Sequence, residues 1–263
     1  MKRLLLLLVL IFTLTVTAAT AGDASVVLCF PGGPGSTADA QPVVDRFMAQ
    51  LSKEMGWKDA KGVYFNQMST CKHAYKDHAA TLVMVPLNVY LEVRTSWKLN
   101  PIVLMNNKES SGQFHVITKT ASCSGCLKGQ TVTTGLKMSN NFLSRVAFDG
   151  KLQVGKGFTL KRTRSPIRAI KSVLKDKAIA AIVNDAQRRS LKGLPGTEEI
   201  NTIISGPKLP GAIVASVGKP APALKKVLLG LCKAQKELCK EMRITGFGKV
   251  DSARLKSLEE KLK

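Results

Sequence analysis

The sequence has few aromatic residues and only three histidines. Aromatic side chains make up 5% of its 263 residues. Trp57 and Trp97 are its only tryptophans, and neither lies in an expected cleft loop, which disfavours a sugar site built on broad stacking surfaces. The sequence contains no Gly-x-Ser-x-Gly and no His-Glu-x-x-His, and no histidine lies in a catalytic motif. We therefore expect a binding protein and not an enzyme.

Acidic residues are also scarce, since 18 Asp and Glu oppose 40 Lys and Arg, a formal net charge of +22. Such a charge fits three roles: steering a small oxyanion into a cleft, adhesion to nucleic acid or anionic lipid, and solubility. The basic residues are scattered along the chain, and no zinc-finger, RNP or helix-turn-helix motif is present. The sequence thus disfavours a nucleic-acid partner.

The longest apolar run is short and lies at the amino terminus. Two basic residues precede residues 4–16, and Ala19-Thr20-Ala21 follows with small residues at the cleavage spacing. This pattern predicts a signal peptide over residues 1–21, because a transmembrane anchor needs about 18 or more apolar residues. The first cysteine, Cys29, does not follow a small-residue lipid-attachment motif. We expect a soluble protein exported to the periplasm, with a net charge of +20 after cleavage removes two basic residues.

Short apolar segments alternate with amphipathic helical patterns along the remaining chain. This alternation indicates an α/β protein with parallel sheets. The expected strands are 26–30, 63–65, 82–85, 102–105, 114–118, 131–133, 178–183, 203–204 and 212–215. Helical stripes are formed by Val43, Val44, Phe47, Leu51 and Met55, by Leu224, Val227, Leu228 and Leu231, and by Leu255, Leu258 and Leu262.

One helix is expected directly before the most apolar strand. Ser165 is a candidate N-cap with Pro166 at the first helical position. Ile167, Ile170 and Leu174 fall on one face at helical spacing. We expect this face to be buried.

A polar group follows that strand. Residues 178–183 are continuously apolar, as in a central strand of a parallel sheet, and Asn184-Asp185-Ala186-Gln187 comes next. Ligands of open α/β sheets bind at such strand ends, so Asp185 is a candidate ligand contact. A strand-end turn or an interlobe hydrogen bond would explain it equally well.

Four segments carry a resemblance to a known family: "SPIRAIKSVLKDKAIAAIVNDAQ", "LKGLPGTEEINTIISGPKLPGAIVAS", "TLVMVPLNVYLEVRTSWKLNPIVLM" and "LKGQTVTTGLKMSNNFLSRVAF". They resemble the phosphate/phosphite/phosphonate-binding proteins of ABC transporters. The resemblance implies a two-lobed type II periplasmic-binding-protein fold with a ligand cleft between the lobes. It implies a discontinuous first lobe, residues 22–112 and 195–263, and a second lobe, residues 113–194. The last helix is expected to pack across the first lobe.

Glycines lead into the first expected helix, where backbone N–H groups and hydroxyls can bind an anion. Gly35, Ser36 and Thr37 are the candidates, although a flexible turn with an ordinary N-cap explains them equally well. The resemblance adds Asn88 and Tyr90 after a first-lobe strand. A buried tyrosine bonded to backbone is the alternative for Tyr90.

The resemblance also adds neutral donors at the start of a second-lobe helix, namely Ser139, Asn140 and Asn141. Helix capping alone would explain these residues too. In the same cleft, Asp185 would accept a proton from a partly protonated oxyanion or from an amino group on a phosphonate, and would repel a fully ionised ligand.

Six cysteines in an exported chain favour disulfides, and six allow 15 pairings. The preferred pairing is Cys29–Cys71, Cys123–Cys126 and Cys232–Cys239. The third pair would be about 10 Å apart along a continuous helix, so it requires a turn near residues 235–237. The Cys-Ser-Gly-Cys spacing leaves open a thiol–disulfide redox protein. Cys71, His73 and His78 suggest a metal site only weakly, since no fourth ligand is evident.

The sequence thus predicts a monomeric exported solute-binding protein that captures a small oxyanion (phosphate, phosphite or phosphonate) for an ABC permease in the inner membrane. We expect no cofactor, no metal and no nucleic-acid partner. The alternatives are an orphan family member that binds another ligand or acts in envelope signalling, and a CxxC redox protein.

Overall fold

The structure is a computed structural model that describes residues 24–33, 35–107, 112–120, 123–220 and 222–263. The predicted signal peptide, residues 1–21, lies outside the described residues. Within the described ranges, no helix is both long enough and apolar enough to cross a bilayer.

The first lobe is built on a six-stranded sheet of order β11-β4-β10-β3-β1-β2. Its strands are β1 (Ala24–Cys29), β2 (Ala60–Phe65), β3 (Leu82–Val85), β4 (Leu99–Asn106), β10 (Ala212–Val217) and β11 (Gly246–Lys249). Its helices are α1 (Thr37–Met55), α2 (Met68–Asp77), α3 (Leu87–Val93), α7 (Pro222–Ala234) and α8 (Lys236–Glu241). Side chains alternate across β1: Val26 and Leu28 pack in one core cluster with residues of α1 and α7, and Val27 and Cys29 pack in another with residues of α2 and α3.

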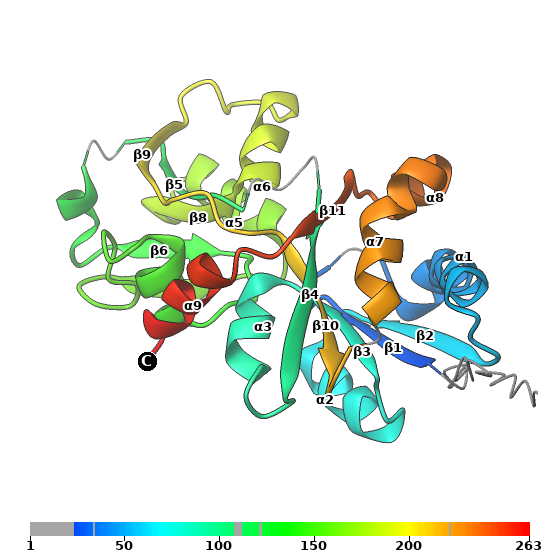
Figure 1. Ribbon diagram of the computed structural model, residues 1–263. Coiled ribbons are helices and arrows are strands. Elements are labelled where there is room, and N and C mark those ends of the chain that lie inside the picture. The colour runs from blue at the N-terminus through cyan, green and yellow to red at the C-terminus, as the bar shows by residue number, and fades with distance from the viewer. Residues whose placement is uncertain (1–23, 34, 108–111, 121–122, 221) are drawn as a thin grey trace, which may run out of the picture.

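The second lobe is built on a five-stranded sheet of order β7-β6-β8-β5-β9. Its strands are β5 (Phe114–Thr118), β6 (Thr131–Thr134), β7 (Thr159–Arg162), β8 (Ala180–Asn184) and β9 (Asn201–Ser205). Short helices surround it: η1 (Ser124–Leu127), α4 (Asn140–Phe142), η2 (Leu143–Ala147), α5 (Pro166–Leu174), α6 (Asp185–Arg189) and η3 (Ser190–Gly193). Figure 1 shows this lobe at the left and the first lobe at the right.

The α/β class is confirmed, but both sheets are mixed and not parallel throughout. Strand β8 pairs in parallel with β6 and antiparallel with β5. Strand β10 is antiparallel to both of its neighbours. Each sheet contains antiparallel pairs because the chain crosses between the lobes after β4 and returns after β9. The expected return after residue 194 is too early, since β9 pairs with β5 in the second sheet.

The C-terminal segment, α9 (Ser252–Glu260) with the residues after it, contacts both lobes and not the first alone. Figure 1 shows it in red beside the second lobe and near α3. Glu259 forms an ion pair with Arg94 at the end of α3, and Lys261 forms one with Asp149 of the second lobe. The C-terminal segment therefore spans the two lobes.

Helix α5 begins at Pro166 as expected, but its buried face differs from the predicted one. The buried side chains are Ala169, Ile170 and Val173, and Ile167 is exposed. Ala169 completes the core face because its small side chain fits against the sheet, so the helix is rotated relative to the stripe of larger residues.

Candidate functional site

A cavity of about 350 Å³ lies between the two lobes. The first lobe lines it with Phe30–Gly33 after β1, Pro86–Asn88 after β3, and 209–212 at the start of β10. The second lobe contributes 135–138 after β6 and the start of α6 after β8. The cavity thus lies where the carboxyl ends of several strands meet, the usual ligand position in open α/β sheets.

Of the described residues that line this cavity, Lys137 is the single charged one. A Cβ atom built on Gly32 of the first lobe would lie 3.0 Å from Cγ of Lys137, so the lysine reaches across the cleft. In the part of the chain that the structure describes, the Lys137 ammonium forms no ion pair. Among the lining residues that the structure describes there is no carboxylate, so the charge they contribute is positive.

Neutral amide groups supply further donors. Asn184 and Gln187 form a capping box at the start of α6, in which each side-chain oxygen accepts a hydrogen bond from the other residue's backbone N–H, at 3.0 and 3.1 Å. Because the side-chain oxygens already accept these hydrogen bonds, the two side-chain NH₂ groups are the parts of Asn184 and Gln187 that can donate to another group. Asn88 is buried and also lines the cavity. The cavity thus offers one cation and amide donors, a combination that suits an oxyanion.

Apolar side chains form most of the remaining wall. They are Phe30, Leu87, Met105, Phe114, Leu136, Met138, Phe142 and Leu209. Such walls accept the organic part of a small ligand.

Asp185 does not line the cavity. Its Oδ1 lies 2.8 Å from Nε2 of His115, and its Oδ2 accepts a hydrogen bond of 3.3 Å from the Gln113 backbone N–H. His115 Nδ1 lies 2.8 Å from Ser205 Oγ, and Gln113 Nε2 donates to the Gly206 carbonyl at 2.7 Å. This network, in which Asp185 and His115 are buried, joins the start of α6 to both segments that cross between the lobes. Both partners of Asp185, Gln113 and His115, belong to the second lobe, so its position corresponds to the structural strand-end alternative and not to the predicted ligand contact.

The glycine-rich loop candidates are engaged with the protein itself. Ser36 caps α1 and donates to the Asp39 carboxylate, and these hydrogen bonds lower the pKa of Asp39. The Thr37 hydroxyl donates to the Tyr64 carbonyl at 2.8 Å. Gly35 lies beside a second cavity of about 370 Å³, against α1 and α8. None of the three candidates lines the interlobe cavity, and the Asp39 carboxylate occupies the helix N-terminus that an anion would need.

The second-lobe candidates Ser139, Asn140 and Asn141 are exposed at the start of α4. Ser139 caps the helix through the Phe142 N–H, Asn140 accepts from Arg162, and Asn141 donates to the carbonyl of residue 262. These residues begin just past the segment 135–138 that lines the cavity. The lysine that enters the cavity is therefore two positions before the predicted group.

Tyr90 is fully buried in the first-lobe core and does not line the cavity. Burial raises the pKa of its phenol, and the Glu259 carboxylate raises it further, opposed by a hydrogen bond and the positive charge of Arg94. Its position corresponds to the alternative of a buried tyrosine and not to a ligand contact in the cavity.

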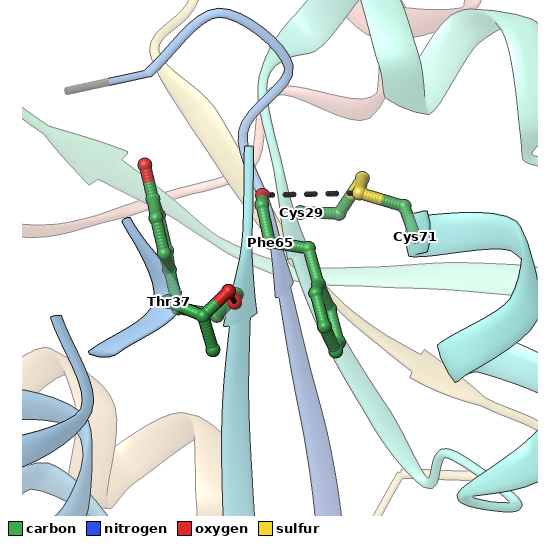
Figure 2. Close-up of a disulfide and its surroundings, with 5 residues drawn as sticks. Cys29, Thr37, Phe65 and Cys71 are labelled. Atoms are coloured by element: carbon green, nitrogen blue, oxygen red, sulfur yellow. Dashed lines mark hydrogen bonds between the residues drawn. A yellow bond between two sulfur atoms is a disulfide. The ribbon is translucent and has the colours of Figure 1, made fainter. Parts of the chain in front are cut away.

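The six cysteines pair as expected: Cys29–Cys71, Cys123–Cys126 and Cys232–Cys239. Figure 2 shows the first pair, which joins the end of β1 to α2 beside the Phe65 carbonyl. The turn required by the third pair exists, since α7 ends at Ala234 and α8 begins at Lys236.

The sequence left open two other roles for cysteine, a redox-active Cys123–Cys126 pair and a metal site at Cys71. The Cys123–Cys126 pair is exposed on η1 and does not line the cavity. Cys71 is bonded to Cys29, so it offers no thiolate to a metal with His73 or His78. Across the described ranges, no group of three or more His, Cys, Asp or Glu side chains is placed to hold a metal ion.

Comparison with solved structures identifies the architecture. The protein XAC2383 from Xanthomonas citri, bound to chloride, superposes with a TM-score of 0.70 at 14% identity, covering 91% of this chain and 97% of that chain. A binding-protein component of an ABC phosphonate transporter from Pseudomonas aeruginosa gives 0.63 at 12% identity, covering 92% and 85%. The aliphatic sulphonate binding protein SsuA from Escherichia coli gives 0.63 at 13% identity, covering 91% and 85%.

The chain has the type II periplasmic-binding-protein fold. At these identities the likeness shows the fold alone. No protein-family model matches the chain, and no curated protein sequence does.

Sequence reasoning missed Lys137, Asn184 and Gln187 as cavity residues. The polar sequence after β8 did indicate the right segment, but a strand end does not show which side chain faces the ligand. Nothing in the sequence distinguishes Lys137 from the other basic residues, of which the chain has 40 in total.

Proposed function

We propose that this chain is an exported, monomeric solute-binding protein that captures a small oxyanion and delivers it to an ABC permease in the inner membrane. The ligand classes are phosphate, phosphite and phosphonate. Binding needs no covalent chemistry: the lobes hold the ligand between them, and the two crossing segments act as a hinge.

The observation that carries the proposal is the charge of the interlobe cavity. Lys137 is the one charged residue among the described lining residues, and Asn184 and Gln187, whose side-chain oxygens are held in the capping box, belong to the second-lobe wall. Hydrogen bonds between a cation and an oxyanion are stronger than neutral ones. A carboxylate in the wall would oppose an anionic ligand, and the lining residues within the described ranges include none.

The wall composition favours an organic oxyanion over a bare inorganic one. The cavity volume of about 350 Å³ is at the small end of the range for ligand pockets. Apolar side chains surround the polar group, and they would pack against a methyl or short alkyl substituent. Among the proposed classes, a phosphonate meets both requirements.

The test is thermal unfolding of the processed chain with phosphate, phosphite, methylphosphonate, aminoethylphosphonate and sulfate. A ligand at about 100 times its Kd adds roughly 2.7 kcal/mol to the free energy of unfolding. We expect the largest rise in Tm with a phosphonate. If no anion moves the transition, the oxyanion proposal fails, and a different ligand, a membrane sensor partner or the cysteine pair becomes the next hypothesis.

The redox alternative has its own assay. Catalysed insulin reduction that disappears in a Cys123→Ser variant would favour a thiol–disulfide exchanger over a binding protein. We expect no such activity and an unchanged ligand-induced rise in Tm in that variant, since Cys123 does not line the cavity.

A further inference from the structure

The segment around α5 is strongly basic. Between Lys161 and Lys177 the chain carries seven basic residues and one acidic residue, Asp176. Asp176 lies 3.7 Å from Lys119, outside this segment. The segment thus contributes a large positive charge to one part of the second-lobe surface.

Six of these basic residues form what we call the α5 basic surface: Lys161, Arg164, Arg168, Lys171, Lys175 and Lys177. All six are exposed. Over the described residues, none of the six forms an ion pair or a side-chain hydrogen bond. By contrast, Arg162 donates to the Leu136 carbonyl and to Asn140. Within the described residues, the charge of the α5 basic surface is therefore not neutralised by side-chain partners.

Helix geometry concentrates this charge on one side. Arg168, Lys171 and Lys175 recur at i, i+3 and i+7, opposite the buried side chains of the helix. Ile167 precedes Lys171 by one turn and is the one large hydrophobic residue of the described chain that is exposed, at 38%. An apolar side chain therefore lies within the α5 basic surface.

We propose that the α5 basic surface binds anionic phospholipid headgroups, with Ile167 inserting at the boundary between headgroups and acyl chains. Basic side chains beside an exposed apolar one match a membrane interface, which offers negative charge and apolar contact together. A nucleic-acid backbone offers the charge without the apolar layer. The predicted export and the three disulfides also indicate a compartment with membrane surfaces and without nucleic acid.

Membrane binding through this surface would place the cleft close to the bilayer. Pro166, the first residue of α5, lines the interlobe cavity. A protein bound through α5 would therefore present the second-lobe side of its cleft to a membrane-embedded partner. The inference rests on the proposed export, but not on the identity of the ligand.

The test is co-sedimentation of the processed chain with vesicles of phosphatidylcholine alone or mixed about equally with phosphatidylglycerol, in about 0.15 M NaCl. Each Lys or Arg near an anionic bilayer contributes about fivefold to affinity. The variant Arg168→Gln/Lys171→Gln/Lys175→Gln should therefore bind the anionic vesicles about 100-fold more weakly.

The matched control is Lys225→Gln/Lys226→Gln/Lys233→Gln, which removes the same net charge from exposed positions of α7 in the other lobe. We expect it to weaken binding by less than about fivefold. Ile167→Ser should weaken binding without any change in charge. For every variant, thermal unfolding with and without the anion that gives the largest rise in Tm measures both folding and ligand binding in the cleft. A failure of membrane binding is thereby distinguishable from a failure of the proposed function.

Three results would overturn the inference. The first is no binding of the wild-type chain to anionic vesicles. The second is an equal loss in the α5 and α7 variants, which would show that only net charge matters. The third is a selective loss of duplex DNA binding in the α5 variant with vesicle binding unchanged, which would assign the surface to nucleic acid.

Discussion

Replacement of Asp185 by alanine should destabilise the fold while ligand affinity stays close to wild type. Asp185 is 7% exposed, and its carboxylate lies 2.8 Å from His115 Nε2 and 3.3 Å from the Gln113 backbone nitrogen. Alanine removes both contacts at once. It leaves His115, which is 2% exposed, without its carboxylate partner.

The magnitude follows from these contacts. A hydrogen bond to a charged group contributes about 1.5–3 kcal/mol, and the longer bond to Gln113 contributes less. Removal of the carboxylate also leaves buried donors without an acceptor, which costs about 1–3 kcal/mol. We therefore expect the free energy of unfolding to fall by about 3 kcal/mol. For a chain of this size, the Tm should drop by about 6–12 °C.

The assay is urea unfolding at neutral pH, with Glu199→Ala as the matched control. The Glu199 carboxylate lies 3.4 Å from Lys119 and is 68% exposed, so its loss should cost no more than about 1 kcal/mol. The reasoning is refuted if Asp185→Ala is as stable as the control. It is also refuted if the variant keeps its stability and loses ligand binding, because Asp185 would then be the ligand contact predicted from the sequence.

Two further predictions concern stability. In the chain-entropy account, the Cys29–Cys71 disulfide, with a sequence separation of 42, contributes about 4 kcal/mol to the free energy of unfolding. The Cys232–Cys239 disulfide, with a separation of 7, contributes about 2.5 kcal/mol. Urea unfolding of the two paired Cys→Ala variants should show the larger loss for Cys29–Cys71, and the reverse order would contradict this account. Because the pKa of Tyr90 is raised, the folded state holds the phenolic proton more tightly than the unfolded state, so the free energy of unfolding should fall as the pH rises above about 10. Tyr90→Phe should lose less stability between neutral pH and pH about 11 than wild type does, and parallel pH profiles would show that Tyr90 does not contribute.

The sequence predicted the strands whose apolar character is strong. Residues 82–85 and 114–118 form β3 and β5 within the predicted bounds. It missed β7 and β11, because Thr159–Arg162 is mostly polar and Gly246–Lys249 is half glycine. Both lie at sheet edges, where backbone pairing suffices and an apolar pattern is not required.

The candidate site was predictable only at the level of segments. The segments after β6 and β8 were identified from the sequence, but the polar residues that line the cavity there are Lys137, Asn184 and Gln187. Asp185 begins a helix and is drawn into a network with His115, which is distant in sequence, and no local pattern predicts that contact. Side-chain direction at a strand end depends on such tertiary partners.

The central claim is that Lys137 holds an anion between the lobes, and titration calorimetry of three proteins tests it most directly. Wild type, Lys137→Gln and Lys151→Gln would each be titrated with the anion that gives the largest rise in Tm. Lys151 is an exposed second-lobe lysine outside the cavity lining, so its variant matches the loss of charge. The account predicts that Lys137→Gln weakens binding by about 10- to 100-fold, the equivalent of one charge-assisted hydrogen bond, and that Lys151→Gln binds like wild type. Equal affinity for all three proteins would contradict it.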